Sequence, residues 1–528
     1  MTRTRTARSV AASVAIAALT LTACSPQSGQ DSEPAATSEA DPNVTAGTDS
    51  ALADYYTQDL SWGECEYSAE DHQDAAENLD CAQVKVPVDY ANPGAGDTFV
   101  EVSRLSSSED DPQGTLFLNP GGPGGSGVDM MLSAGFFASA SVRDNYDIVG
   151  FDPRGVDRSD GIECLTDQEM DEWRAEPAFD PQSETVEDMR ATYAEIGSKC
   201  KAKSSPVVSH MDTQSVAKDL DVMRAVFDQP ATHYLGFSYG AEIGATYASL
   251  FPQRTGRFVL DGGVDPTMDE RAVTLDQAKG FEENLRHWVE DCQETNNRCV
   301  VGNDGVDAGM QKIQDLLAKV AEDEITVSDG RRITPVNAVE GILVPLYSTA
   351  PYPQLNSALE KALDGNFDEL MGYSDSNHGR TSSGEYTSNV SEAFTAVNCL
   401  DTVSRDVSEQ DMAQAADTME QEAPTFGPYL SYGDAACQGW PDEPVEPLDS
   451  YAADTDQPLL VVGTTHDPAT PYAWSEALVD KLGNARLLTN DGWGHTAYVS
   501  GDSCIKDAVD TYLVSGAVPD EGATCGSA

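Results

Sequence analysis

The sequence predicts an α/β protein with a mostly parallel sheet, helices on both faces of the sheet, and an inserted, largely helical cap. Short apolar runs alternate with helical patterns along the chain, which is typical of strand–helix–strand units. The runs are nearly continuous rather than alternating, as expected for strands that are covered on both faces. They are residues 114–119, 146–152, 233–237, 257–262, 458–463 and 485–489.

The helical patterns between these runs have recognisable starts and apolar faces. In the segment 212–228, Asp212 or Thr213 can cap the first turn. Val216 and Leu220 begin one apolar stripe in the same segment. Helices of this kind can cover a parallel sheet.

The alternation of strands and helices stops between about residues 266 and 450. That stretch holds helical segments, four cysteines and a loop rich in glycine and serine, and apolar runs resume only at Pro458. We therefore expect a cap domain at residues 266–450, inserted into a core that comprises residues 61–265 and 451–528.

The first residues have the composition of an export signal. Arg3, Arg5 and Arg8 precede an apolar run that is too short for a membrane-spanning helix. The run ends in Leu-Thr-Ala-Cys, which resembles the bacterial lipobox. The resemblance implies removal of residues 1–23 and lipidation of the Cys24 thiol. An unmodified, unpaired thiol is the alternative.

The segment 24–60 is polar, acidic and poor in aromatic residues, which predicts a disordered tether. A lipidated Cys24 would attach the protein to the extracellular side of the cell membrane. Without lipidation the protein would be secreted. The folded part is expected to begin near residues 60–62.

The remaining ten cysteines point to disulfides rather than to a metal site. They are widely spread, without C-x-x-C pairs or neighbouring histidines, so zinc is not expected. Disulfides fit an exported protein, but the sequence leaves their connectivity open. Pairing each cysteine with its neighbour would give Cys65–Cys81, Cys164–Cys200, Cys292–Cys299, Cys399–Cys437 and Cys504–Cys525.

The formal net charge of −59 excludes one class of partner. Binding to nucleic acid needs a cationic surface for the phosphates, so we expect no nucleic acid partner. A solvated, salt-tolerant acidic surface accounts for the charge, although such a surface could also favour cationic ligands.

The segment 233–252 contains the only G-x-S-x-G of the chain, Gly236-Phe237-Ser238-Tyr239-Gly240. An apolar strand precedes it and an amphipathic helix follows it. This is the setting of a nucleophile elbow, where a strained turn projects the serine from the sheet. Ser238 is therefore the candidate nucleophile, and a tight structural turn is the alternative.

A serine nucleophile needs a base and an acid that orients the base. Of the seven histidines, His495 alone lies in a loop directly after the final predicted strand, and Asp467 follows the strand before it. The order Ser238, Asp467, His495 is that of α/β-hydrolases. The alternatives are a surface-loop histidine and a turn-forming Asp-Pro.

An oxyanion hole is the remaining requirement. Residues 117–127, FLNPGGPGGSG, follow an early strand and expose backbone amides that no side chain obstructs. We expect the hole to be built from the N–H groups of Tyr239 and Gly122. The alternative, a phosphate-binding loop, is excluded because no G-K-[ST] follows and the region contains no lysine.

Six segments carry distinctive motifs: NPGGPGGSG (119–127), GFDPRGVDRS (150–159), GFSYGAEIGATYASLFP (236–252), VLDGGVDP (259–266), GTTHDPATPY (463–472) and GWGHTAY (492–498). Together they resemble the actinobacterial secreted tripeptidyl aminopeptidases, over about residues 80–525. The resemblance implies an α/β-hydrolase fold, related to the prolyl aminopeptidases, with a TAP-like C-terminal segment. Asn119-Pro120 stands where prolyl aminopeptidases carry a histidine, and Glu242 departs from the expected pattern.

The resemblance implies a serine peptidase that removes short peptides, with tripeptides expected, from free N-termini, and that needs no metal or organic cofactor. An acid must then hold the ammonium group of the substrate, a contact worth about 1.5–3 kcal/mol. Asp401 and Glu392 in the cap are the candidates. A solvated surface acid is the alternative for each.

We therefore expect an exported, lipid-anchored serine aminopeptidase of the tripeptidyl type that acts on peptide or protein N-termini. A carboxylesterase or lipase-type hydrolase of the same fold would use the same three residues and the same oxyanion hole. A non-catalytic solute-binding lipoprotein is the alternative from a different class.

Overall fold

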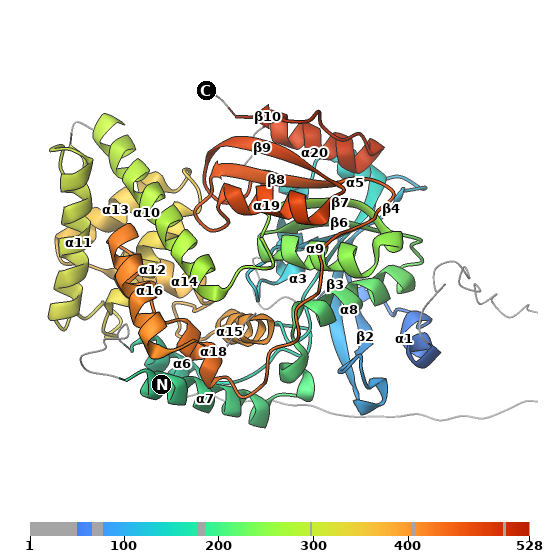
Figure 1. Cartoon of the computed structure of the whole chain (residues 1–528), viewed down its shortest axis with the longest axis horizontal. Coiled ribbons are helices and arrows are strands. Elements are labelled where there is room, and N and C mark those ends of the chain that lie inside the picture. The colour runs from blue at the N-terminus through green and yellow to red at the C-terminus, as the bar shows by residue number, and fades with distance from the viewer. Residues whose placement is uncertain are drawn as a thin grey trace, which may run out of the picture. The chain divides into compact units, whose positions relative to one another are not determined.

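Ten strands of the described chain form one sheet in the order β1-β2-β3-β5-β4-β6-β7-β8-β9-β10 (Figure 1). The structure is a computed structural model, and it describes residues 50–65, 78–176, 185–295, 298–402, 407–499 and 503–526. The predicted signal peptide and Cys24 lie outside these residues. From β5 to β10 in this order all neighbours pair in parallel, whereas β1, β2, β3 and β5 pair antiparallel.

The six predicted strands are confirmed as the parallel centre of this sheet. They are β4 (Gly114–Asn119), β5 (Tyr146–Phe151), β6 (Thr232–Phe237), β7 (Thr255–Asp261), β8 (Leu459–His466) and β9 (Ala485–Trp493). Four further strands were not predicted: β1 (Gly63–Glu64), β2 (Leu79–Pro87), β3 (Asp97–Leu105) and β10 (Thr524–Cys525). The mostly parallel sheet matches the predicted fold class.

Alternate residues of the central strands pack on opposite faces of the sheet. Phe117 and Phe258 lie in one apolar core, to which α8 (Thr213–Val226), α9 (Tyr239–Leu250) and α19 (Tyr472–Leu482) contribute among other helices. Leu116 and Val259 lie in the other core, with four helices, α3 (Gly127–Met130), α4 (Ala134–Phe137), α5 (Ala140–Asn145) and α20 (Ser503–Ser515). Burial on both faces explains why these strands are continuous apolar runs.

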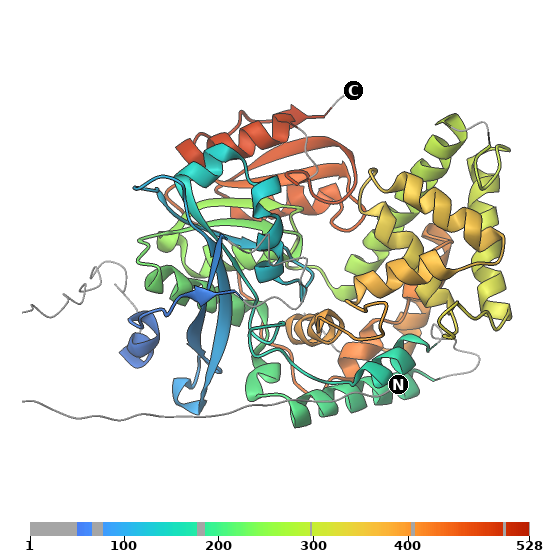
Figure 2. The same ribbon diagram turned by 180° about the vertical axis from the view of Figure 1, so that it is seen from behind.

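A helical insertion separates β7 from β8 and has an apolar core of its own, which includes Leu285, Trp288 and Ile342. Its helices are α10 (Glu270–Thr295), α11 (Val306–Glu322), α12 (Pro335–Leu346), α13 (Tyr352–Leu363), α14 (Asp368–Asn377), α15 (Val390–Asp401), α16 (Glu409–Glu422), α17 (Gly427–Leu430) and α18 (Asp434–Gly439). In both ribbon views α15 lies between the sheet and the other helices of the insertion (Figures 1 and 2).

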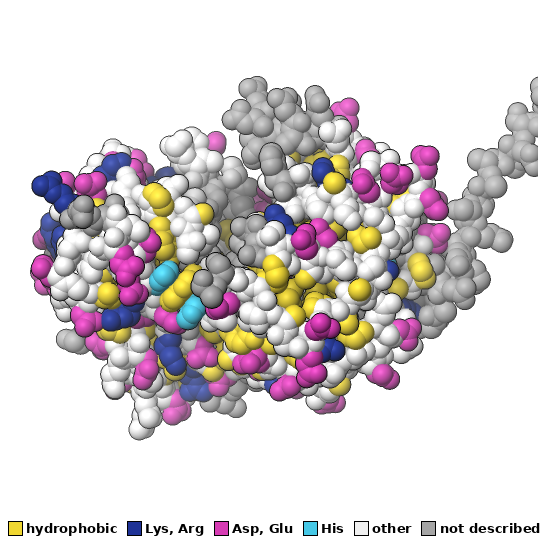
Figure 3. All heavy atoms as spheres, turned by 90° about the horizontal axis from the view of Figure 1, so that it is seen from above, with side chains coloured by type: hydrophobic (Ala, Val, Ile, Leu, Met, Phe, Trp, Pro, Cys, Tyr) yellow, Lys and Arg dark blue, Asp and Glu magenta, His cyan; other side chains and the backbone are white. Residues whose placement is uncertain are grey.

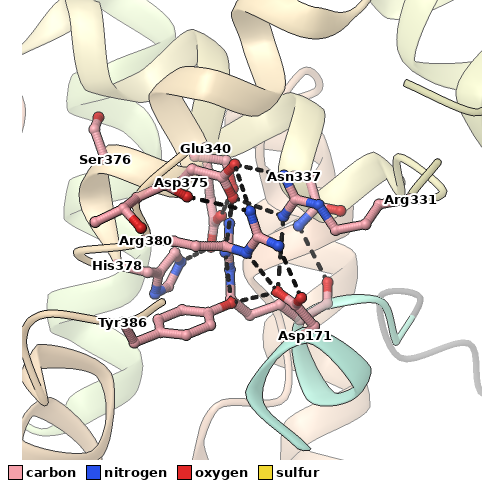
Figure 4. A network of polar contacts seen from close by, with 12 residues as sticks. Asp171, Arg331, Asn337, Glu340, Asp375, Ser376, His378, Arg380 and Tyr386 are labelled. Carbon is pink, nitrogen blue, oxygen red and sulfur yellow. Dashed lines mark hydrogen bonds and ion pairs between the residues drawn. The ribbon is translucent and has the colours of Figure 1, made fainter. Parts of the chain in front are cut away.

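Two helices from the first part of the chain join this insertion. The helices α6 (Asp167–Arg174) and α7 (Val186–Lys203) follow β5, in the segment that the sequence analysis assigned to the core. Figure 4 shows the polar network that ties α6 to the insertion. Arg380 donates to both carboxylate oxygens of Asp171 (2.7 and 2.9 Å), and Arg174 donates to Asp375 (2.9 Å).

The folded part begins before residue 60. Helix α1 (Ala53–Tyr56) buries Tyr55 and Tyr56. Their hydroxyls donate to Asp97 (2.6 Å) and Asp221 (2.7 Å), respectively. A tether that extends to residue 60 is therefore wrong for residues 50–60, because two adjacent tyrosines anchor a segment whose overall composition is polar.

Five disulfides stabilise the described chain. The structure joins each cysteine to its neighbour in the sequence, as Cys65–Cys81, Cys164–Cys200, Cys292–Cys299, Cys399–Cys437 and Cys504–Cys525. The sequence had left this connectivity open. Cys399–Cys437 links α15 to α18, and Cys504–Cys525 links α20 to β10.

The surface carries the negative charge that the composition demands. Figure 3 shows Asp and Glu side chains spread over the face seen from above, among fewer Lys and Arg side chains. Among the residues that the structure describes, no helix has both the length and the apolar character needed to cross a membrane.

Candidate active site

The serine of the G-x-S-x-G motif lies at a strained turn between β6 and α9. Ser238 has φ 56° and ψ −124°, a conformation that residues with a side chain rarely adopt. Its N–H donates to the carbonyl of Asp261 at the end of β7 (2.8 Å). A Cβ at Gly236 would collide with the carbonyl of Gly240, and one at Gly240 would lie 2.6 Å from the carbonyl of Asn119. The motif therefore needs both glycines for close backbone approach.

Asp467 and His495 form a hydrogen-bonded pair after β8 and β9. Nδ1 of His495 lies 2.9 and 3.0 Å from the two carboxylate oxygens of Asp467, which is only 3% exposed. Oδ1 also accepts the N–H groups of Ala469 (2.9 Å) and Thr470 (2.8 Å). Oδ2 accepts the N–H of Thr496 (3.1 Å). A carboxylate fixed in this way directs the Nδ1 proton toward itself and leaves Nε2 to act as a base.

The environment of His495 favours its charged form. Burial by itself lowers the pKa of the imidazole, but the Asp467 carboxylate raises it through its charge and its hydrogen bond. Asp261 adds to the same effect. As a result, the pKa of His495 lies above its ordinary value.

Asp261 is a site residue whose role the sequence did not reveal. Its side chain is fully buried and accepts the N–H of Ala497 (3.0 Å) and the N–H of Tyr498 (2.8 Å). Burial raises the pKa of this carboxyl to about 6, although the backbone hydrogen bonds oppose the rise. Asp261 thereby fixes the segment that directly follows His495 and Thr496.

Thr470 is a second residue that the sequence analysis did not nominate. Its hydroxyl donates to Oδ2 of Asp467 (3.1 Å) and lies 3.3 Å from Nδ1 of His495. The side chain is buried, so these polar contacts satisfy it. Thr470 therefore braces the Asp467–His495 pair from one side.

Two contacts place Ser238 and His495 around the end of β7. The N–H of Ser238 binds the carbonyl of Asp261, and a Cβ on the next residue, Gly262, would lie 3.3 Å from Cε1 of His495. The hydroxyl of Ser238 and Nε2 of His495 make no hydrogen bond to any residue that the structure describes. Neither reactive atom is engaged elsewhere in the described chain.

The glycine-rich loop after β4 packs against the serine turn. A Cβ on Gly121 would lie 3.1 Å from both Cβ of Ser238 and N of Tyr239, and the φ of Gly121 is 93°. The N–H of Gly121 donates to Oδ1 of Asn119 (2.9 Å). The amides of Gly122 and Tyr239 have no acceptor within the described ranges. These are the two donors expected for an oxyanion hole.

Asp152 of the GFDPRGVDRS motif holds this loop in place. Its side chain is fully buried. Oδ1 accepts the hydroxyl of Ser126 (2.6 Å) and the N–H of Val128 (3.0 Å), and Oδ2 accepts the N–H of Arg158 (3.2 Å). Burial raises the pKa of Asp152 to about 7. The motif therefore supports the loop that carries the predicted oxyanion donor.

Helix α15 keeps a strip of accessible residues along one face. The residues follow the spacing i, i+4, i+8 and i+11, which aligns them on a helix. We call this the α15 strip: Val390, Phe394, Asn398 and Asp401. Thr395 beside it is also partly exposed, and the remaining residues of the helix are buried.

The two ends of the α15 strip touch the surroundings of the nucleophile. At one end, a Cβ on Gly124 of the glycine-rich loop would lie 2.9 Å from the carbonyl of Val390. At the other end, Asp401 accepts the N–H (3.0 Å) and the hydroxyl (2.7 Å) of Thr213. The Thr213 hydroxyl also bonds the hydroxyl of Tyr239 at 2.6 Å. The strip therefore runs from the predicted oxyanion loop to the residue next to the nucleophile.

The structure separates the two acids that were expected to hold a substrate ammonium group. Asp401 lies next to Thr213, on the side of the nucleophile. Glu392 is buried on the opposite side of α15, together with the disulfide-bonded Cys399. Burial raises the pKa of Glu392 to about 7, although the N–H of Leu165 donates to it. The role expected for Glu392 is therefore wrong, because its position in the helix turns the side chain away from the site.

Glu242, one helical turn after Ser238, is better placed than Glu392 to hold a substrate ammonium group. Its side chain is partly exposed and has no hydrogen-bond partner in the described part of the chain. Burial, together with the charge of Asp265, raises its pKa to about 7. Burial also raises the pKa of Asp401 well above its ordinary value, with Asp212 and Glu242 adding to the shift. Both shifts favour the neutral acids in the free protein, and a cation bound between them would favour their ionised forms.

Helix α10 clamps the segments that lead to the acid and the base. The indole of Trp493 is stacked between the imidazoles of His466 and His287, with ring centroids 3.9 and 3.8 Å apart and interplanar angles of 7° and 8°. His466 directly precedes the acid, and Trp493 stands two residues before the base. Nδ1 of His466 also lies 3.0 Å from Glu283 of α10. In the described ranges, no group of His, Cys, Asp and Glu side chains is arranged to hold a metal ion.

The fold and the site together define the class: the chain is a serine hydrolase of the α/β-hydrolase fold. A family model described as "alpha/beta hydrolase fold" matches residues 114–303. A second family model, described as "TAP-like protein", matches residues 423–525. The class argues against a non-catalytic solute-binding lipoprotein.

Comparison with sequence relatives identifies the family of this serine hydrolase. The chain is 35% identical to "Serine protease Hip1" of Mycobacterium tuberculosis, over 84% of this chain and 87% of the relative. It is 31% identical to "Carboxylesterase B" of Mycobacterium tuberculosis (88% and 89%) and 29% identical to "Tripeptidyl aminopeptidase" of Streptomyces coelicolor (85% and 83%). The chain belongs to the actinobacterial tripeptidyl aminopeptidase family, as the sequence motifs led us to expect.

Proposed function

We propose that this chain is an exported, lipid-anchored serine peptidase that releases short peptides, in particular tripeptides, from free N-termini. The observation that carries the proposal is a pair of partly exposed acids: Glu242, one helical turn after Ser238, and Asp401, whose partner Thr213 bonds the hydroxyl of Tyr239. A substrate ammonium group bound there would make charge-assisted hydrogen bonds of about 1.5–3 kcal/mol. The relatives named as a serine protease and a tripeptidyl aminopeptidase support the same reading.

The reaction follows from the roles of five residues. Ser238 attacks the scissile carbonyl while Nε2 of His495 accepts its proton, and Asp467 stabilises the imidazolium. The amides of Tyr239 and Gly122 bind the oxyanion of the tetrahedral intermediate. His495 then protonates the leaving amine, and water hydrolyses the acyl-enzyme. The hydrogen bond between Ser238 and His495 forms as substrate binds, since such bonds are often long before that step.

The pH dependence follows from the base. A protonated His495 cannot accept the serine proton, so kcat/KM falls as the pH drops through the pKa of His495. Since Asp467 raises that pKa, the midpoint lies above the ordinary value of about 6.5.

The rest of the chain bears on two further properties: the size of the substrates and the location of the enzyme. We propose that the insertion, residues 266–450, together with α6 and α7, forms a cap over a core made of the rest of residues 61–265 and residues 451–528. Such a cap admits oligopeptides or exposed protein ends. Export and lipidation at Cys24 rest on the signal and lipobox of the sequence.

Hydrolysis of tripeptide arylamides with free and with acetylated N-termini tests the proposal. We expect kcat/KM to be about 10- to 100-fold higher for the free amine, as the contact energy implies. Glu242→Gln should remove most of this difference. Glu322→Gln, at an exposed glutamate of α11, is the matched control and should preserve it. Preference for the acetylated peptide would overturn the aminopeptidase assignment.

A carboxylesterase is the second candidate, and the relative named Carboxylesterase B favours it. Ester and amide hydrolysis use the same acyl-enzyme chemistry, so the site geometry supports both. Short acyl esters added to the same assay separate the two, because hydrolysis of esters alone would establish the esterase. Labelling by a fluorophosphonate, abolished in Ser238→Ala, identifies the nucleophile in either case.

A further inference from the structure

One residue of the α15 strip is far more exposed than its neighbours. Phe394 is 50% exposed, and it is the only exposed residue of α15; the rest of the helix is partly or fully buried. The sheet lies on one side of α15 and the other helices of the insertion on the other (Figures 1 and 2). The side chain of Phe394 is therefore only half covered by the described residues that pack around α15. Exposed large apolar groups of this kind mark binding surfaces.

The position of Phe394 along the strip fixes which part of a substrate it meets. Phe394 follows Val390 by one helical turn, and Val390 touches Gly124 of the glycine-rich loop. The acids that would hold the ammonium group lie at the other end, near Asp401. A peptide bound between these ends brings the side chain that precedes its scissile bond to the apolar end of the strip.

The side chains at the apolar end of the strip are themselves uncharged. Val390 and Phe394 are apolar, Ala393 beside them is fully buried, and Thr395 and Asn398 are uncharged. A charged substrate side chain would lose hydration against Val390 and Phe394, whereas an apolar side chain would be stabilised by burial against them.

A second exposed aromatic residue lies beside the base. Tyr347 is 42% exposed, and its ring centroid lies 5.5 Å from that of the His495 imidazole. Because His495 protonates the leaving amine, Tyr347 lies on the side of the leaving group. Phe394 is therefore the aromatic residue that lines the part of the site where the acyl portion of the substrate binds.

We propose that Phe394 determines specificity for the residue before the scissile bond, and that the enzyme selects peptides with an apolar side chain at that position. The proposal rests on the peptidase function proposed above and adds the substrate class.

The test is a series of tripeptide arylamides with free N-termini that differ only in the third residue: Gly, Ala, Leu, Phe, Asp or Lys. We expect the wild type to hydrolyse the Leu and Phe peptides with a kcat/KM about 10-fold or more above the Gly peptide, and to disfavour Asp and Lys. Phe394→Ala should lose about 10-fold on the Leu and Phe peptides and change less than about 3-fold on Gly. Phe394→Leu, which keeps an apolar wall, should retain the preference.

Phe99→Ala is the matched control, since Phe99 of β3 is also exposed (37%) and none of the contacts at the site involves it. This variant should behave as the wild type on every peptide. An active wild type without preference for apolar residues, or a Phe394→Ala variant that loses the same factor on all peptides, would overturn the specificity role. A wild type that hydrolyses none of the peptides but hydrolyses acyl esters would overturn the peptidase function itself.

Discussion

Replacement of Asp467 by Asn tests the relay most directly. Oδ1 of Asp467 accepts two backbone N–H groups, from Ala469 and Thr470, so the amide oxygen of Asn must take this place. The amide NH₂ then occupies the place of Oδ2 and faces Nδ1 of His495. Because Nδ1 lies about equally close to both positions (2.9 and 3.0 Å), a donor at one of them competes with the acceptor at the other and favours the tautomer with its proton on Nε2, which cannot accept the serine proton.

The expected loss follows from that tautomer. We predict that kcat falls about 10⁴-fold, which corresponds to about 5 kcal/mol of transition-state stabilisation. KM should change little, because Asp467 is 3% exposed and cannot reach the substrate. Stability should fall by about 1–3 kcal/mol, since the NH₂ also meets the N–H of Thr496 and leaves it without an acceptor.

The assay measures kcat and KM on a tripeptide arylamide, together with the melting temperature and the rate of fluorophosphonate labelling. Asp480→Asn, at an exposed aspartate of α19, is the control and should match the wild type. A folded Asp467→Asn enzyme that keeps more than about a tenth of the wild-type kcat would refute the relay.

Three further predictions concern stability and the clamp on the active-site loops. Asp219→Ala leaves the fully buried Arg154 without its bidentate partner (2.6 and 2.7 Å), and should lower the free energy of unfolding by about 3–5 kcal/mol in urea titrations. A loss below about 1 kcal/mol would contradict this reading. Trp493→Leu removes the stacking of the indole on both imidazoles, which is worth about 0.5–1.5 kcal/mol for each pair. We expect this variant to lower kcat about 10-fold at unchanged KM. The His287→Phe variant keeps a stacking ring and should retain activity. Equal losses in the two variants would show that the stack does not position the loops. Finally, burial raises several carboxyl pKa values to about 6 or 7, so the folded chain holds protons that the unfolded chain releases, and stability should fall as the pH rises from about 4.5 to 7. The groups are Asp152, Glu242, Asp261, Glu270 and Glu392. Two histidines with lowered pKa values, His233 and His287, oppose this trend but are outnumbered. Thermal unfolding at pH 5.5 and 7.5 checks the sign, and a higher melting temperature at pH 7.5 would contradict it.

Features set by local sequence were predictable. The central strands are buried on both faces, so each appears as a continuous apolar run that needs no knowledge of its neighbours. The serine turn is equally local, because Gly236 and Gly240, the glycines that permit its close backbone contacts, lie within five consecutive residues. Asp467 and His495 could be nominated because each directly follows such a strand.

Features set by tertiary contacts were not predictable. Strands β2 and β3 at the antiparallel end of the sheet have exposed positions among their buried ones, so they carry no continuous apolar run. Asp261 lies in a recognisable motif, but its role depends on backbone amides more than 200 residues away in the sequence. Glu392 was nominated and Glu242 was not, because only the packing of the helices shows that α15 buries Glu392 and that α9 leaves Glu242 partly exposed.

The contacts of the insertion bear on how a substrate can enter. Gln277 and Asn284 of α10 donate to the carbonyls of Ala469 and His466, on either side of the acid (2.8 and 3.2 Å). The carbonyl of Tyr347, also in the insertion, accepts the N–H of His495 (2.8 Å). If the insertion swung away as one rigid body, these bonds would break and the acid and base would lose their support. An opening motion that keeps the acid and base supported must therefore leave α10 and Tyr347 in place, so that only other elements of the insertion can move aside for the substrate.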